Sequence, residues 1–157
     1  MRDEALALFG YTPADLDSRL PPAYAEAGAA HLILPLNSRE RLAAMRYDLA
    51  AGRAFMKRTG VVTIAWVHAE SATLLHARNA FAAGGVYEDP ATGAAAAALA
   101  GHLRDSGWLR AGAIEILQGF DMGVPARLRA EYGPEPGSSV RVAGTAHALA
   151  RQPALID

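Results

Sequence analysis

One helix-forming stretch limits how this chain can fold. The segment from Thr92 to Asp105 is rich in alanine, with Leu99 and Leu103 one helical turn apart. No charged side chain lies between Thr92 and Ala100. A helix that is apolar on every side belongs in the interior of a protein, and small side chains let strands approach it closely. We therefore predict a helix in the centre of the fold whose N-terminal end is directed toward a site.

The segments around this helix predict a sheet. Short runs rich in β-branched, aromatic and leucine side chains, separated by Gly and Pro, are typical of strands. The expected strands are 31–36, 61–67, 73–81, 114–117, 126–132 and 140–149. Helices are expected at 2–9 and 48–58, and Asn37 is expected to cap another helix that includes Leu42. The order predicts an α+β domain with a mixed, mainly antiparallel sheet wrapped around the central Ala-rich helix.

Length and charge exclude several classes of protein. A chain of 157 residues is long enough for one domain with a real core, so we expect residues 1–157 to form a single domain. The net charge of −1 gives no basic surface for nucleic acid or for an anionic membrane. The absence of Cys excludes disulfides, a thiolate nucleophile and a Cys-ligated metal. No signal peptide or membrane span is evident, so a cytoplasmic location is expected.

The entrance to the central helix is the candidate site. Glu88 and Asp89 precede its first turn, where the positive end of the helix dipole favours acidic groups. Thr92, Gly93 and Ala94 should present backbone N–H groups that have no partner within the helix. Such an end can bind a carboxylate or a phosphate without a cationic side chain. The alternative is ordinary capping, in which Asp89 is the N-cap, Pro90 begins the helix, and nothing binds.

The longer string around this entrance carries a resemblance. Val-Tyr-Glu-Asp-Pro-Ala-Thr-Gly-Ala-Ala, residues 86–95, is similar to the Glu-Asp-Pro-Ala-Thr-Gly motif of the PhzF-like phenazine-biosynthesis family. Other stretches agree with the family across nearly the whole chain. They are Arg78, Gln118-Gly119 followed by Met122-Gly123 and Pro125, the closing Val142-x-Gly144-x-Ala146, and the segment Leu34-Pro35-Leu36 with Ser38-Arg39-Glu40.

The resemblance implies a fold like that of diaminopimelate epimerase and an isomerase activity. Family members have two similar domains, and the central helices of both point into the cleft between them. They move a proton on small carboxylated substrates without metal or cofactor. By this resemblance Asp89 is the catalytic candidate, and the chain is equivalent to the second domain only. The implied substrate-binding residues are Glu88, Thr92, Gly93, Ala94, Gln118, Gly119, Met122 and Gly123.

The chain also departs from the family. The catalytic Glu and its partner His belong to the first domain, and no stretch here matches that motif. Ala94 and Ala126 stand where the family usually has Ser, and Val124 stands where it usually has Arg. An absent general base and lost polar groups cast doubt on the standard chemistry.

Two functions are therefore open. In the first, the chain is half of an isomerase that is completed by a second copy or by a separate N-terminal-domain chain. In the second, it is a non-catalytic binding or regulatory module that holds a small carboxylated metabolite at the helix end. A decayed fragment is a third, minor possibility.

Histidine and turn residues suggest less. His68 and His76 lie on adjacent expected strands and face each other if the hairpin closes between Glu70 and Thr73. A metal would need Glu70 as a third ligand, so no metal is expected. Asp121 lies in a Gly-rich turn and is expected either to reach the cleft or to bond locally.

Overall fold

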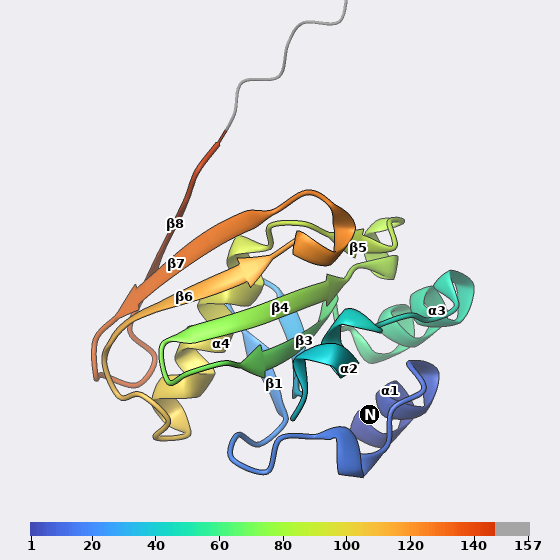
Figure 1. Ribbon diagram of the computed structural model, residues 1–157, viewed down its shortest axis with the longest axis horizontal. Coiled ribbons are helices and arrows are strands. Elements are labelled where there is room, and N and C mark those ends of the chain that lie inside the picture. The colour runs from blue at the N-terminus through green and yellow to red at the C-terminus, as the bar shows by residue number, and fades with distance from the viewer. Residues whose placement is uncertain (147–157) are drawn as a thin grey trace, which may run out of the picture.

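The computed structural model describes residues 1–146, in which a curled sheet surrounds one helix (Figure 1). The helices are α1 (Arg2–Leu8), α2 (Arg39–Ala43), α3 (Leu49–Thr59) and α4 (Gly93–Asp105), with 3-10 turns η1 (Pro13–Asp15), η2 (Ala82–Gly84) and η3 (Phe120–Met122). The strands are β1 (Ala23–Glu26), β2 (Ala30–Pro35), β3 (Thr63–Ala69), β4 (Leu74–Ala80), β5 (Glu88–Asp89), β6 (Gly112–Gln118), β7 (Ala126–Tyr132) and β8 (Val140–Gly144).

The sheet is mixed, as the order of elements predicts. Neighbouring strands follow the order β1-β2-β3-β4-β6-β7-β8, and the short β5 pairs with β4 outside this path. The pairs β2–β3 and β4–β6 are parallel, and the other pairs of the described residues are antiparallel. The predicted α+β class with a mainly antiparallel sheet is thereby confirmed.

Helix α4 lies inside the curl of the sheet, as its composition predicts (Figure 1). Leu99 and Leu103 are fully buried, and they pack with the inward side chains of the strands, among them Leu75 and Ile116. Small side chains on several sides of the helix, such as Ala95 and Ala98, allow this close approach. The helix begins at Gly93, one residue later than the predicted start.

The opposite face of the sheet is covered by α1, α2 and α3 (Figure 1). Trp66 of β3 is the centre of this second core and contacts the rings of Phe9 and Tyr11. Helix α3 begins where the side chain of Asp48 accepts a hydrogen bond from the Ala51 amide at 2.7 Å. It ends at Gly60, which adopts the left-handed conformation.

Several predicted local features are wrong. Ser38, not Asn37, caps α2, because its hydroxyl accepts from the Arg41 amide, whereas Asn37 donates its side-chain amide to the carbonyl of Ala14. The sequence did not indicate β1 or β5, and strand β3 begins at Thr63 rather than Val61. The strand predicted at 140–149 ends at residue 144. Its positions 147–149 lie outside the described residues.

None of the helices in the described part of the chain has the length and apolar character that a bilayer span requires.

Burial of His31 makes the stability of the fold depend on pH. Burial lowers the pKa of this imidazole, whose Nδ1 lies 2.8 Å from the hydroxyl of Thr63. The folded state keeps the ring neutral, whereas the unfolded chain binds a proton below about pH 6.5. Unfolding therefore takes up a proton, and we expect the urea midpoint to fall as the pH decreases from 7.5 to 5. His31→Asn should flatten this dependence, and an unchanged slope in the variant would contradict the assignment.

Candidate functional site

The site lies where β5 leads into α4. Glu88 and Asp89 form β5 and pair with Ala80 and Asn79 of β4. The chain then turns, and Thr92 occupies the N-cap position without a capping hydrogen bond from its own side chain. Asp89 is therefore not the cap, and the alternative of ordinary capping by this residue is wrong. A strand holds the carboxylate of Asp89 just before the helix entrance.

A buried glutamine fixes this junction from β6. The side-chain oxygen of Gln118 accepts a hydrogen bond from the Thr92 amide at 3.2 Å. Its Nε2 donates to the carbonyl of Asp89 at 2.6 Å and to the hydroxyl of Thr92 at 3.0 Å. That hydroxyl in turn donates to Oδ2 of the Asp89 carboxylate. Since the Gln118 side chain belongs to a neighbouring strand, it fixes the position of Asp89 relative to the sheet.

Three backbone amides at the helix end are free. The first helical hydrogen bond runs from the Ala96 amide to the Thr92 carbonyl at 3.0 Å. The amides of Gly93, Ala94 and Ala95 have no hydrogen-bond acceptor among the described residues. Space beside Gly93 is open, since a Cβ placed there would meet nothing within 4 Å. The helix dipole adds partial positive charge at this point, so the arrangement can hold an anion.

The side chain of Glu88 points to the opposite face of the sheet from that of Asp89, and it forms an ion pair there. Both of its carboxylate oxygens accept hydrogen bonds from Arg78, and both side chains are buried. Arg78 also donates to the carbonyls of Ala43 at 2.8 Å and Met45 at 3.3 Å. Burial alone would lower the pKa of Arg78, but the hydrogen bonds and charge of Glu88 outweigh it and raise that pKa. This pair joins β4 and β5 to the loop between α2 and α3.

The glycine-rich turn after β6 lies against the junction. Gly119 has a positive φ of 78°, and a Cβ there would lie 3.0 Å from the carbonyl oxygen of Pro90, so the two segments touch. Asp121 accepts two hydrogen bonds from Nη2 of Arg39, at 2.9 and 3.0 Å. Asp121 therefore forms an ion pair with a distant residue instead of a hydrogen bond within its own turn, and this pair connects the turn to α2. The resemblance includes Arg39 but assigns it no role.

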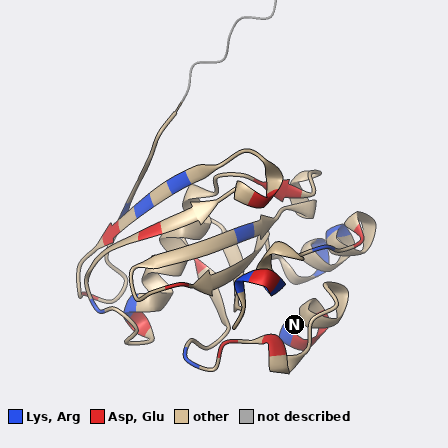
Figure 2. Ribbon diagram, viewed as in Figure 1, with Lys and Arg blue, Asp and Glu red and all other residues tan. Residues whose placement is uncertain are grey.

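The junction has an apolar rim. Large apolar side chains are exposed just before β5 and on the turn after β6, namely Val86, Tyr87, Phe120 and Val124. Figure 2 marks acidic residues on β5 and on the adjoining turn, and the N-terminal part of α4 contains no charged residue. Met122 and Gly123 of the turn lie on this rim, at the end of η3.

The hairpin that brings the two histidines together does form. His68 and His76 are direct cross-strand partners with ring centroids 6.4 Å apart. Nε2 of His76 lies 2.7 Å from a carboxylate oxygen of Glu70. Among residues 1–146, no three His, Cys, Asp or Glu side chains are arranged to hold a metal ion.

The fold and the site together define a protein with the diaminopimelate-epimerase-like architecture. The family model for phenazine biosynthesis-like proteins, PhzC-PhzF, matches residues 2–152, so the chain belongs to that family. No curated protein matches the chain at a significant level.

Solved structures agree with this assignment. A predicted epimerase from Pseudomonas aeruginosa is 26% identical over 99% of this chain, with a TM-score of 0.77. A PhzF-family phenazine biosynthesis protein from Bacillus anthracis has the same fold, with 19% identity over 90% of this chain and a TM-score of 0.73. The chain covers 52% and 50% of those two proteins, respectively, so it spans about half the length of the structures it matches.

Loss of the Arg78 guanidinium should destabilise the fold strongly. Arg78→Met would leave Glu88 buried without a partner, which costs about 3–5 kcal/mol in comparable sites. We expect Glu88→Leu in the same chain to restore more than half of the lost unfolding free energy, since the isolated charge is then removed. Urea unfolding of the two single variants and the double variant measures this coupling. Simple additivity of the two losses would contradict a direct ion pair.

Proposed function

We propose that this chain supplies one wall of a cofactor-independent proton-transfer site for a small carboxylated substrate. The proposal rests on one observation: the Asp89 carboxylate lies at the same end of α4 as three free backbone amides. Membership in the phenazine biosynthesis-like family supports the isomerase class. The similarity to a predicted epimerase supports the same class of chemistry.

The two halves of the junction have different tasks. The amides of Gly93, Ala94 and Ala95 hold a substrate carboxylate or the enolate charge that develops when a proton leaves the adjacent carbon. Oδ2 of Asp89 accepts from Thr92, whereas Oδ1 has no hydrogen-bond partner among the described residues. That free oxygen positions the substrate or receives its proton. Gln118 holds both parts at a fixed separation.

The remaining predicted residues contribute indirectly. Glu88 acts through Arg78 as a support for β5, because neither of its oxygens is free. Gly119 brings the turn against Pro90, and Met122 and Gly123 form part of the rim on that side. These residues set the shape of the entrance, whereas Asp89 and the backbone amides contact the charged part of the substrate.

The second wall comes from another domain. The chain spans about half of the structures it matches, and we propose that it corresponds to their second half. A separate N-terminal-domain chain or a second copy then covers the junction and supplies the opposing acid–base group. Exposed apolar side chains such as Val86 and Val124 beside the junction are the surface that such a partner would bury.

A binding module is the second candidate function. Ala94 has no hydroxyl to offer at the entrance, and the ion pair with Arg78 occupies Glu88. Binding of a carboxylate at the amides needs neither group, so a metabolite can be held here without proton transfer.

Asp89→Asn tests the proposal directly. We first measure the mass of the chain by light scattering, alone and after co-expression with the product of the neighbouring coding region. In the assembled protein, exchange of substrate protons with deuterated water is then followed by NMR on a set of small carboxylic acids. Asp89→Asn should slow the exchange at least about 100-fold, since a lost general acid–base group costs that much.

A matched control keeps the result specific. Glu115→Gln also removes one carboxylate, but on an exposed site of β6, and should leave the exchange rate unchanged. A monomer under both conditions would contradict assembly with a partner. Carboxylate binding without exchange would favour the binding module, and exchange that persists in Asp89→Asn would exclude a direct role for this residue.

A further inference from the structure

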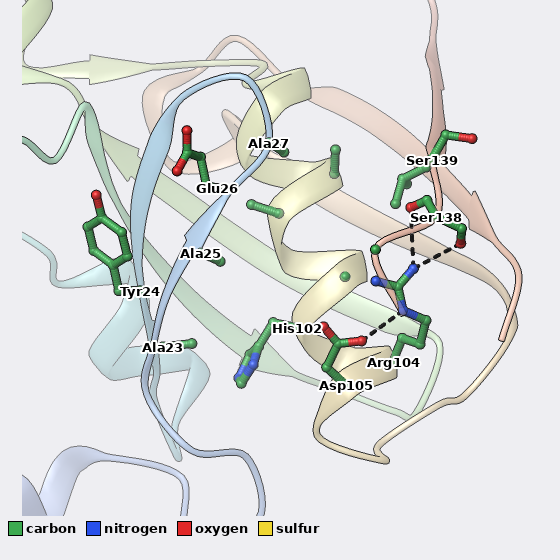
Figure 3. A pocket seen from close by; sticks show the side chains of 15 residues that line it. Ala23, Tyr24, Ala25, Glu26, Ala27, His102, Arg104, Asp105, Ser138 and Ser139 are labelled. Atoms are coloured by element: carbon green, nitrogen blue, oxygen red, sulfur yellow. Dashed lines mark hydrogen bonds and ion pairs between the residues drawn. The ribbon is translucent and has the colours of Figure 1, made fainter. Parts of the chain in front are cut away.

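A groove of about 600 Å³ lies at the other end of α4, away from the junction (Figure 3). One wall is β1 and the other is the segment from Gly137 into β8. The floor is the C-terminal half of α4. The residues that form the helix junction do not line this groove, so it is a separate feature of the surface.

One wall is a strand edge that lacks a partner. Strand β1 is an end of the main strand path, so it has one hydrogen-bonded neighbour within the described residues. An unpaired edge exposes a row of backbone N–H and C=O groups that can pair with an added strand. The opposite wall consists of residues 137–139 and Val140, the first residue of β8, and α4 lies between the two walls.

The floor is shaped for a close approach of backbone. Small groups form one part of it, those of Ala97, Ala98 and Gly101, and the larger side chains of His102, Arg104 and Asp105 line the part nearer the end of the helix. Along β1, Ala23 and Ala25 are the half-buried positions, whereas Tyr24 and Glu26 are exposed and point away from the helix in Figure 3. Small side chains at alternate positions of an added strand would fit this floor, because alternate residues of a strand face the same side.

A buried cation lines the groove with an unused donor. The Arg104 side chain is only 5% exposed. Its Nε donates to Asp105 at 2.8 Å, and its Nη1 donates to the hydroxyl of Ser138 at 3.2 Å. Its Nη2 has no acceptor among residues 1–146 and lies beside Gly101 on the floor. This nitrogen is open to the groove, so it is available to donate a hydrogen bond to an occupant.

The charges around the groove select a neutral acceptor. Asp105 already balances Arg104, and Glu26 adds a further negative charge on β1. The C-terminal end of α4 is also the negative end of its dipole. A carboxylate would be repelled here, whereas a peptide carbonyl would satisfy Nη2 at no electrostatic cost.

We infer that the groove is a docking site for an extended peptide segment of another polypeptide, with small uncharged side chains at alternate positions. The segment adds a strand to the free edge of β1 and accepts a hydrogen bond from Nη2 of Arg104 through a backbone carbonyl. About four residues match the length of β1. This inference does not depend on the proposed function.

Peptide titration tests the site. The probe is a capped heptapeptide in which Ala alternates with Thr, added to the intact chain while backbone amide signals are followed by NMR. Saturable shifts should centre on β1 and on residues 137–140, which form the two walls of the groove. A peptide with Leu in place of Ala, and one N-methylated at alternate backbone nitrogens, should bind at least tenfold more weakly, because they lose the fit to the floor and the strand pairing, respectively.

Two substitutions at one position provide the matched control. Gly101→Leu should fill the groove and weaken binding at least tenfold. Gly101→Ala should bind almost as the parent, since a Cβ there would lie 3.8 Å from Nη2 of Arg104, an ordinary contact. Equal binding of the N-methylated peptide, or no saturable shift at millimolar peptide, would overturn the inference. A third result would also overturn the inference: the chain self-associates, Gly101→Leu abolishes that self-association, and no peptide binds.

Discussion

The close contact between α4 and the sheet is the constraint on which the rest of the structure depends. A helix can lie inside a curled sheet only if its side chains are small on most sides, and α4 satisfies this with alanine while Leu99 and Leu103 fill the wider spaces. The helix is then fixed in position and direction. Its N-terminal amides therefore lie at one end of the curl, at the same end as the C-termini of β4, β5 and β6.

Contacts between distant parts of the sequence hold that end in place. Gln118 reaches back to Thr92, Arg78 joins Glu88 to the loop after α2, and Asp121 pairs with Arg39. Each contact joins two different elements, so the position of Asp89 depends on the whole sheet. The Asp89 carboxylate is therefore held in one position by β5 and by the hydroxyl of Thr92, which Gln118 holds in turn.

Features that depend on local chemistry could be predicted from the sequence. The buried helix, a helix over most of α3, strand β7 and the mixed sheet all follow from periodicity, composition and turn residues. Strands β1 and β5 could not, because they are four and two residues long and their pairing, not their composition, makes them strands. The cap of α2 lay one residue from the expected position because Asn37 found a tertiary acceptor.

The candidate site also combines features that the local sequence predicts with features that depend on distant residues. The motif around Asp89 predicted a site at the N-terminal end of α4, where the structure places the Asp89 carboxylate and three free backbone amides. It did not show that Thr92 is the cap, that its amide is engaged, or that Glu88 is buried against Arg78. These outcomes depend on side chains from β4 and β6, whose positions follow only from the folded sheet.

The two ends of α4 divide the chemistry of the molecule between them. At the N-terminal end, free amides and the dipole favour an anion, and the Asp89 carboxylate stands beside that position without occupying it. At the C-terminal end, Arg104 is balanced by Asp105, and the groove favours a neutral backbone. The two ends therefore differ in chemistry: the N-terminal end presents hydrogen-bond donors to an anion, and the C-terminal end forms the floor of a groove beside the free edge of β1.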